Sequence, residues 1–451
     1  MTQGPIRKQL ISFALPLFAG SLIQLLYNTV DLMFVGRVLG TEASAAVGAS
    51  SLIVTCILGA FTGLSVGVGV VTAKAVGSGN IGRLNQIIHC AAGLTCVLSL
   101  VFTVLGLIMA PEFLRGIQTP ADVLENATAY LRLYLLSLIS IVSYNMGSGI
   151  LRALGNTKSP TLYQLAGGIA NIIGNTLFIC FLDWGVQGAA LATACSQGLA
   201  AFLIIRHLCT IKTPYRLRLR QLQINASICG QFLLVGIPAA IQSIVITLSN
   251  LIVQAHINQL GIDSMAAFTA YFKVENFIYL PIMAFGQACS TFTSQNIGAN
   301  QVDRAKQGVK TSLFLGITVT ISASVLTLCF SDFAFGLFSK EPAVIALGTK
   351  IAFVAYPFYF IYVFLEVYAS AIRGAGKALP AMLIVVINMC VVRTCILKVV
   401  LHFYPNALGV AAIYPLTWAC TGLCLFLYYK SGGWFSAQTD VARKRISVGQ
   451  R

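Results

Sequence analysis

Charged residues are scarce in this sequence, and acidic residues are the scarcest. Only 9% of the 451 residues are Asp, Glu, Lys or Arg, whereas about 25% are charged in average soluble proteins. A soluble fold of this length could not cover its surface with so few. The mean hydropathy is +0.84, and the chain divides into apolar stretches of the ~20 residues needed to cross a hydrocarbon core. The sequence therefore predicts an all-α integral membrane protein.

Several chemical motifs are also missing. No Walker-type nucleotide loop and no His/Cys cluster with metal spacing occurs, so ATP-driven pumping by this chain alone is excluded and neither a metal nor another cofactor is expected. The thirteen cysteines are scattered, and the closest pairs, Cys420 with Cys424 and Cys390 with Cys395, lack zinc or redox spacing. We interpret the cysteines as small packing residues.

Basic residues give the chain a formal charge of +16. They lie in short loops rather than in a groove with aromatic platforms, which excludes nucleic acid as a partner. Alternate loops sort by charge, and one side has little beyond Arg37, Arg115, Lys340 and Lys350. Because Lys and Arg are retained in the cytoplasm, we predict a multi-pass cell-membrane protein with both termini cytoplasmic. The first apolar run is too long for a signal peptide and is expected to stay as a span.

Twelve transmembrane helices are predicted from the apolar stretches. They lie near residues 11–36, 43–73, 88–110, 130–151, 161–182, 186–208, 226–258, 263–293, 309–331, 349–370, 380–402 and 408–430. In the second helix, Gly59, Gly63 and Gly67 recur at a spacing that lets helices approach closely.

The two halves of the chain match in one register. "LRALGNTKSP" ends the fourth span and "IRGAGKALP" ends the tenth, which places Arg152 and Arg373 221 residues apart (373 − 152). The same offset takes Arg83 to Arg304. An even number of spans in each half makes the halves two parallel six-helix repeats, as in transporters whose substrate site lies between the repeats. Duplication also builds channels and scaffolds, so the repeat alone does not identify a transporter.

This register divides the chain into lobes. We predict an N-lobe at residues 1–211, a basic cytoplasmic linker at 212–223, a C-lobe at 224–430 and a cytoplasmic tail at 431–451.

Ionisable residues inside the spans are few, and each costs roughly 2.5 to 3.5 kcal/mol at a helix centre. In the first span, Asp31 shares a helical face with Gln24, Tyr27 and Asn28. Between the first and seventh spans the register is shifted by one residue, since Pro16 and Pro238 are 222 residues apart (238 − 16), and the residue that then matches Asp31 is the apolar Val253. A carboxylate removed from water holds a proton or, when ionised, coordinates Na⁺ with neighbouring oxygens. It can equally serve only to fix helix packing.

Neutral polar residues could complete a site around this acid. Asn171 and Asn175 lie one turn apart in the fifth span, and Thr193 in the sixth offers another oxygen. These asparagines are candidates for cation or proton coupling, although asparagine also joins helices through hydrogen bonds worth about 0.6 kcal/mol.

The C-terminal half carries its own buried charges. Lys273 and Glu275 lie in the eighth span, Glu366 in the tenth and Arg393 in the eleventh. We expect pairing at buried depth, for example of Glu366 with Arg393, in a structural ion network. Glu275 remains a secondary candidate for binding a cation or a proton, and Lys273 and Arg393 could contact an anionic substrate.

An aromatic stripe, "YPFYFIYVFLEVY", runs through the tenth span and could wall a cavity for flat apolar cations. Core packing explains the stripe almost as well. The residues predicted to line a substrate cavity are Gln24, Gln242, Asn250, Tyr356, Tyr359 and Tyr362.

With these residues in place, the sequence resembles the multidrug and toxic compound extrusion (MATE) family, in its prokaryotic branch. The resemblance is carried by "ALPLFAGSLIQLLYNTVDLMFVGRVLG", by the paired "LRALGNTKSP" and "IRGAGKALP", and by "FTSQNIGANQVDRAKQG". It implies a V-shaped bundle of two six-helix lobes, alternating access, and drug efflux coupled to H⁺ or Na⁺.

The resemblance also implies a site. The family's N-lobe cation site maps onto Asp31, Asn171, Asn175 and Thr193, but the family has aspartate where this chain has Asn175. Glu275 matches an acid that another branch uses in its C-lobe. With one carboxylate left in the N-lobe site, Na⁺ is expected to bind less firmly there.

The predicted function is therefore that of a secondary active multidrug efflux antiporter, not an enzyme. It would export organic, lipophilic cationic compounds in exchange for H⁺ or Na⁺ as a monomer in membrane lipid. The alternatives are a flippase for a lipid-linked precursor and a non-transporting channel or scaffold. A flippase should show a cationic central cavity, and a channel would not accumulate its substrate.

Overall fold

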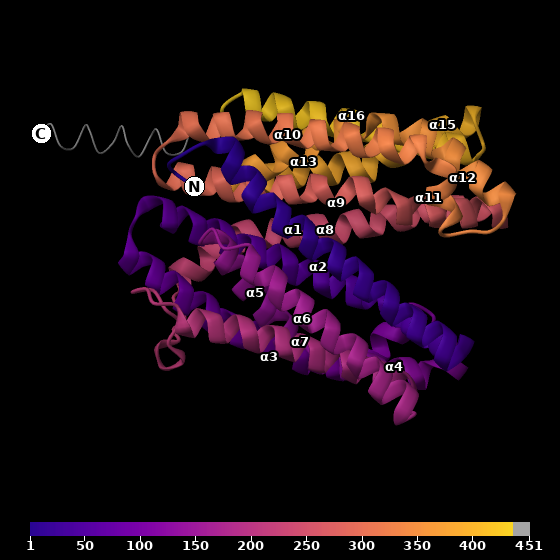
Figure 1. Ribbon diagram of the computed structural model, residues 1–451, viewed down its shortest axis with the longest axis horizontal. Coiled ribbons are helices and arrows are strands. Elements are labelled where there is room, and N and C mark those ends of the chain that lie inside the picture. Colours follow the sequence, from indigo (N-terminus) through magenta and orange to yellow (C-terminus); the bar gives the residue numbers. More distant parts are fainter. Residues whose placement is uncertain (436–451) are drawn as a thin grey trace, which may run out of the picture. The chain divides into compact units, whose positions relative to one another are not determined.

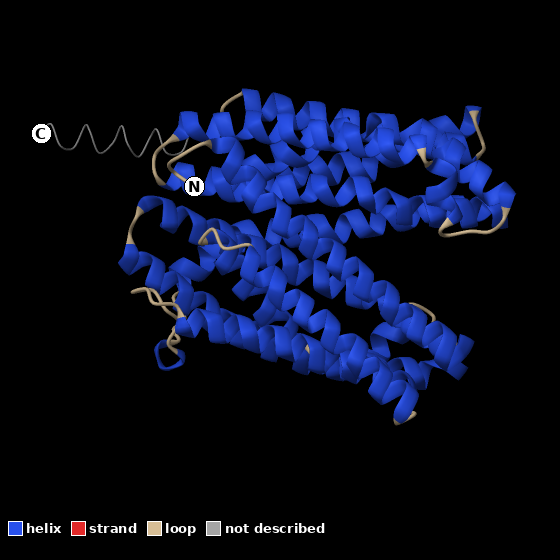
Figure 2. Ribbon diagram, in the orientation of Figure 1, coloured by secondary structure: helices blue, strands red, loops and turns tan. Residues whose placement is uncertain are grey.

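The computed structural model describes residues 1–435, which fold into helices joined by short loops (Figures 1 and 2). No strand occurs within this range, so the predicted all-α fold is confirmed. Most of the predicted tail, at residues 436–451, lies outside the described residues.

The first half of the chain contains the elements before the linker. They are α1 (Ile6–Phe34), the π-helix η1 (Val35–Leu39), α2 (Gly40–Ser78), α3 (Ile81–Gly116), α4 (Ala121–Leu136), α5 (Leu138–Ala153), α6 (Lys158–Asn175), the π-helix η2 (Thr176–Phe181) and α7 (Gly185–Thr210). The predicted linker contains one short 3₁₀-helix, η3 (Leu219–Gln221).

The second half follows the same plan. Its elements are α8 (Ala226–Gln259), α9 (Ile262–Gly298), α10 (Val302–Cys329), α11 (Ser331–Gly336), α12 (Pro342–Ala355), the 3₁₀-helix η4 (Tyr356–Phe358), α13 (Tyr359–Gly374), α14 (Ala378–Val386), the π-helix η5 (Ile387–Val392), α15 (Arg393–Phe403) and α16 (Ala407–Lys430).

The twelve predicted spans all correspond to helices in this part of the chain. Ten spans are long and apolar enough to cross a membrane, and α4 with α5 forms an eleventh that bends by 43°. The twelfth is α9, whose 37 residues make it long enough. Its mean hydropathy is lower because it carries Lys273, Glu275 and the polar stretch 290–296.

Breaks in the spans have local causes. Between α4 and α5, the hydroxyls of Thr103 and Ser137 donate to the carbonyls of Leu135 and Tyr134, which draws these carbonyls away from the helical hydrogen-bond ladder. Pro357 lies in η4, where it supplies no backbone N–H. The connection predicted at residues 37–42 is helical, since η1 leads directly into α2.

The helices form two compact units. The N-terminal unit is Leu15–Ala240, and the C-terminal unit combines Met1–Ala14 with the chain from Ile241 onward. The boundaries fall inside α1 and α8, whereas the lobes were predicted to divide at the linker, 212–223. The linker packs on the N-terminal unit, where the Leu217 N–H donates to the Leu208 carbonyl at 2.9 Å.

Within the N-terminal unit, α6 packs along α7, and α5 packs against α2, α3 and α7. Glycines allow α2 to approach the first half of α8 closely, as their spacing predicts. A Cβ on Gly63 would lie 2.2 Å from the Ala240 nitrogen, and one on Gly67 would lie 2.3 Å from the Phe232 carbonyl oxygen. The two backbones therefore touch along this line.

Within the C-terminal unit, α9 lies beside α10 and α13, and α13 lies beside α16 (Figure 1). Each unit has its own apolar core. Buried residues of the C-terminal core include Phe268, Tyr271 and Trp418, and Phe61 and Phe232 belong to the core of the N-terminal unit. Large apolar side chains are also exposed on outward faces, including Leu100, Ile108, Phe202, Phe314 and Val325. Lipid solvates such side chains, so an exposed apolar belt agrees with a membrane protein.

Candidate functional site

Close approach of α6 and α7 creates the candidate site of the N-terminal unit. A Cβ on Gly174 would lie 3.0 Å from the Ala192 side chain, and one on Gly167 would lie 3.2 Å from the Ser196 carbonyl oxygen. Because α6 offers only hydrogen atoms at these points, α7 can come near enough for its polar residues to meet those of α6.

Four predicted residues meet there in a chain of hydrogen bonds. The Asn175 amide donates to Asp31 Oδ1 at 2.7 Å and to Asn171 Oδ1 at 3.2 Å. The Asn171 amide in turn donates to Thr193 Oγ1 at 3.4 Å, and the Thr193 hydroxyl donates to the Ala189 carbonyl at 3.1 Å. Residues of α1, α6 and α7 that the sequence placed in one site are therefore in contact.

The cluster has acceptor oxygens to spare. Asn171 and Asn175 are fully buried, and Asn175 Oδ1 has no hydrogen-bond partner among the described residues. Asp31 likewise forms no ion pair within the part of the chain that the structure describes. A carboxylate, two amide oxygens and a hydroxyl are ligands that suit a hard cation such as Na⁺. The carboxylate alone suffices for a proton.

The wall of α1 next to Asp31 is polar, as predicted. The Tyr27 hydroxyl accepts a hydrogen bond from the Gln197 amide at 3.5 Å, while Gln24 and Asn28 are exposed. Gln197 was missed by the sequence analysis, although it lies four residues after Thr193 and thus one helical turn along the same face of α7.

Two buried tyrosines of α4 were also missed. Tyr130 and Tyr134 lie close enough to Asp31 for its charge to act on both phenols. Their rings pack against each other with centroids 6.3 Å apart. Their spacing of four residues in an apolar span was the available signal.

In the C-terminal unit, Glu275 is embedded in aromatic side chains. The Tyr359 hydroxyl donates a hydrogen bond to Glu275 Oε1. The Tyr359 ring packs edge-on against Trp418 at 4.5 Å, and Tyr362 packs against the same indole at 5.4 Å. Tyr356 is fully buried, and its hydroxyl donates to the Tyr271 carbonyl at 3.0 Å. Within the aromatic stripe of the tenth span, Tyr359 therefore contacts this acid, and Tyr362 shares its indole neighbour.

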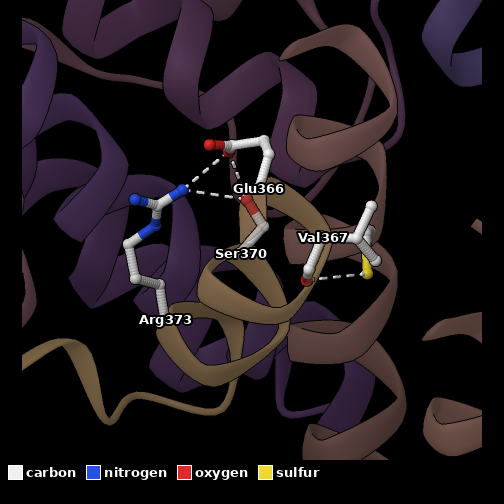
Figure 3. A network of polar contacts seen from close by, with 5 residues as sticks. Glu366, Val367, Ser370 and Arg373 are labelled. Carbon is white, nitrogen blue, oxygen red and sulfur yellow. Dashed lines mark hydrogen bonds and ion pairs between the residues drawn. The ribbon is translucent and has the colours of Figure 1, made fainter. Parts of the chain in front are cut away.

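The predicted pairing of Glu366 with Arg393 is wrong. Glu366 instead accepts a hydrogen bond and forms an ion pair with Arg373 at 2.9 Å, and Ser370 bridges the two side chains (Figure 3). All three residues lie on α13, where positions 366, 370 and 373 share one face. The tenth span was predicted to end at residue 370, but the helix includes Arg373, and its long side chain reaches back along the helix.

Arg393 has different partners. Its guanidinium donates to Asn250 Oδ1 at 2.9 Å and lies 5.4 Å from the centre of the Tyr414 ring. The side chain is buried, and its Nε has no partner among the described residues. Arg393 also differs from Lys273, which was expected at buried depth but is exposed, with its ammonium 5.6 Å above the Phe338 ring. That expectation was wrong because residues 273 and 275 point to different sides of α9.

The residues predicted to line a substrate cavity are distributed differently. Gln24 and Asn250 are exposed, Tyr362 is partly buried, and Tyr356, Tyr359 and Gln242 are buried. A pocket of about 340 Å³ opens between α13 and α16, with an apolar lining that includes Phe364 and Phe426, but none of the predicted cavity residues line it.

Comparison with known proteins extends along nearly the whole chain. The family model MatE matches residues 16–177 and 238–397. The chain is 28% identical to the probable multidrug resistance protein YpnP of Bacillus subtilis, over 96% of this chain and 97% of that protein. It is 25% identical to the FAD transporter of Shewanella oneidensis, over 86% of each. A crystal structure of MATE in the straight conformation shares the fold, with a TM-score of 0.90 and 21% identity over 97% of this chain and 98% of that one.

Proposed function

The chain belongs to the MatE family of multidrug efflux transporters, and from this we propose that it is an antiporter that exports organic cations in exchange for H⁺ or Na⁺. As a family member it is a multi-pass protein of the plasma membrane and not an enzyme. The coupling ion, the substrate class and the cytoplasmic position of both termini belong to the proposal.

The hydrogen-bond chain from Asp31 to Thr193 is the observation that supports it. The Asp31 carboxylate lies among neutral polar side chains inside the N-terminal unit, with an amide donor 2.7 Å away. It lacks a cationic partner among the described residues. Since an unpaired charge inside a membrane is costly, binding of a proton or a cation stabilises this site.

The exchange follows from the charge on Asp31. In the outward-facing state, a proton or Na⁺ from outside neutralises the carboxylate, which weakens the hold on a cationic substrate and releases it. Return to the inward-facing state delivers the ion to the cytoplasm and restores the negative charge that attracts the next substrate cation. Asn175 keeps the carboxylate oriented toward Asn171 in both steps.

The driving force is limited by the stoichiometry. One proton exchanged for one monovalent cation moves no net charge, so only the pH difference drives export. Each pH unit then supplies about 1.36 kcal/mol, or roughly tenfold accumulation. A second coupled ion would add about 2.3 kcal/mol per 100 mV. Because Asn175 stands in place of a second acid, we expect one coupled ion per cycle, and therefore the smaller substrate accumulation.

Uptake of a fluorescent lipophilic cation into inverted vesicles tests the proposal. A proton gradient and a Na⁺ gradient are imposed separately on wild type, Asp31→Asn and Glu275→Gln. We expect accumulation under one gradient, its loss in Asp31→Asn, and its retention in Glu275→Gln. If Asp31→Asn still accumulates the dye against a gradient, coupling through Asp31 is refuted. If only Glu275→Gln fails, coupling belongs to the C-terminal unit.

Arg393 favours a second candidate, an anionic organic substrate. It is a buried cation with no carboxylate at ion-pair distance among the described residues. One relative is named an FAD transporter, and FAD is an anion. Uptake of a flavin nucleotide in the same vesicles distinguishes this candidate. Transport of the flavin that is lost in Arg393→Gln, together with no transport of the lipophilic cation, would establish it.

A further inference from the structure

Two cysteine sulfurs touch inside the N-terminal unit. Cys90 lies near the start of α3 and Cys229 in the first turn of α8, and their Sγ atoms are 3.4 Å apart. Both residues are free thiols and both are buried, Cys90 completely and Cys229 with 8% exposure. Their separation of 139 residues along the chain explains why sequence spacing gave no redox motif.

The surroundings hold the two thiols in this contact. The Asn225 N–H points at Cys90 Sγ at 3.5 Å. The Asn225 side chain accepts hydrogen bonds from the backbone N–H groups of Ser227 and Ile228, which fixes the first turn of α8. Cys229 therefore has little freedom to turn away from α3.

The linker is fastened to the same part of α3. His89 Nε2 accepts a hydrogen bond from the Arg218 N–H at 3.0 Å. A Cβ on Gly93 would lie 2.6 Å from the Gln223 carbonyl oxygen, so only glycine lets the linker lie this close. Contacts at His89, Cys90 and Gly93 thus hold the linker and the start of α8 against α3.

This attachment bears on movement because α8 belongs to both units. Its first part, to Ala240, packs in the N-terminal unit and the remainder in the C-terminal unit. We expect a movement that involves α8 to shift its first part along α3. A covalent tie at Cys229 would prevent the shift.

We propose that Cys90 and Cys229 are an oxidant-sensitive thiol pair whose disulfide arrests transport. The arrest rests on the proposed transport function, whereas formation of the disulfide does not. A disulfide requires an S–S distance of about 2.05 Å, so the sulfurs must approach by about 1.4 Å, which rotation about the two side-chain bonds supplies.

The oxidant is hydrogen peroxide, which is small enough for a buried site. The Cys229 thiolate attacks one peroxide oxygen, breaking the O–O bond, and yields a sulfenic acid and hydroxide, which takes up the proton released by the thiol. The Cys90 thiolate then attacks the Cys229 sulfur and displaces hydroxide, which leaves as water with the Cys90 proton. In sum, two thiols and one peroxide give one disulfide and two waters. Cys229 reacts first because it is the more exposed of the two.

The matching positions of the C-terminal unit do not hold such a pair. The positions 221 residues away hold Thr311 and Lys8. There, the start of the chain is held by Arg304, whose guanidinium donates to the Gly4 carbonyl at 2.7 Å, and by a hydrogen bond from the Met1 amine to Gln295. These contacts are reversible and insensitive to peroxide, so oxidation would act on one unit only.

The test uses the full-length protein in inverted vesicles, treated with hydrogen peroxide, then alkylated, digested and analysed by mass spectrometry. Transport is measured before oxidation, after it, and after reduction with dithiothreitol. The variants are Cys90→Ser and Cys229→Ser. The matched control is Cys289→Ser, which removes another buried thiol, one whose neighbours are Thr293 and the Val367 carbonyl.

We expect a peptide that joins Cys90 to Cys229, a fall in transport of at least about tenfold, and recovery with dithiothreitol. Transport by Cys229→Ser should resist peroxide, and Cys289→Ser should behave as wild type. If a protein that transports yields no linked peptide after oxidation, the proposed thiol pair is refuted and the proposed transport function is not. A linked peptide with undiminished transport would overturn the arrest. If the reduced protein transports nothing under either gradient, the arrest falls together with the proposed function.

Discussion

Replacing Asn175 by aspartate places a second carboxylate beside Asp31. The Asn175 amide nitrogen is 2.7 Å from Asp31 Oδ1 in the fully buried part of the site. An aspartate there would not only remove this hydrogen-bond donor but also set two acids against each other. We expect Asn175→Asp to bind its coupling ion more tightly than wild type.

The magnitude follows from the geometry. Two unit charges about 4 Å apart repel by about 4 kcal/mol at an effective dielectric constant near 20. A shared proton or a Na⁺ between the carboxylates relieves this repulsion, so the gain in ion affinity is bounded by the same energy. Since about 1.4 kcal/mol is a factor of ten, the variant should bind its ion between roughly tenfold and a thousandfold more tightly.

Ion-dependent thermal stability of the purified protein measures this affinity directly, because a ligand that binds only the folded state raises the unfolding midpoint. The midpoint is recorded against Na⁺ concentration and against pH for wild type and Asn175→Asp. The matched control is Asn388→Asp, which also introduces an acid at a buried asparagine. Asn388 lies in η5 and donates to the Ile384 carbonyl.

An ion dependence in Asn175→Asp that equals or falls below that of wild type would refute the assignment of Asp31 and Asn175 to one ion site. A gain that appears equally in Asn388→Asp would also refute it, because the effect would then come from any buried acid.

Two further predictions concern the bundle. Glu366→Gln leaves the Arg373 guanidinium, whose side chain is only 14% exposed, without a carboxylate, which should destabilise the protein by up to about 3 to 5 kcal/mol and lower its unfolding midpoint. An unchanged midpoint would mean that water already solvates the pair. Gly67→Val should also lower the midpoint, because a side chain there meets the Phe232 carbonyl oxygen at 2.3 Å, while Gly48→Ala on the same helix meets nothing within 4 Å and serves as the control. Equal midpoints for the two glycine variants would refute the close backbone contact between α2 and α8.

Hydropathy predicted most of the fold but not all of it. A membrane span must be apolar, so ten helices and one bent pair could be recognised by composition. The signal is weakest for α9, whose charged and polar residues lower its mean hydropathy, although the sequence analysis did list it among the apolar stretches as residues 263–293. Short breaks such as that between α4 and α5 were missed because single hydroxyl groups cause them.

The site was predictable where it depends on helical periodicity. Asn171 and Asn175 share a face because they are four residues apart, and the structure brings both to Asp31 through the contact of α1 with α6. Periodicity failed where a long side chain spans more than one turn. Arg373 pairs with Glu366 seven residues earlier in the same helix. The sequence analysis instead predicted Arg393, on another helix, as the partner of Glu366.

Duplication gave both halves the same order of helices, but it did not give them the same chemistry. Val253, the match to Asp31, is almost completely buried in the apolar core of the C-terminal unit. A carboxylate at that position would be removed from water among apolar side chains. The two acids that lie within the helices at Glu275 and Glu366 already have partners, Glu366 in Arg373 and Glu275 in the Tyr359 hydroxyl. Asp31, which forms no ion pair among the described residues, can therefore take up and release an ion. For this reason we expect loss of Asp31 to abolish ion coupling and loss of Glu275 to spare it.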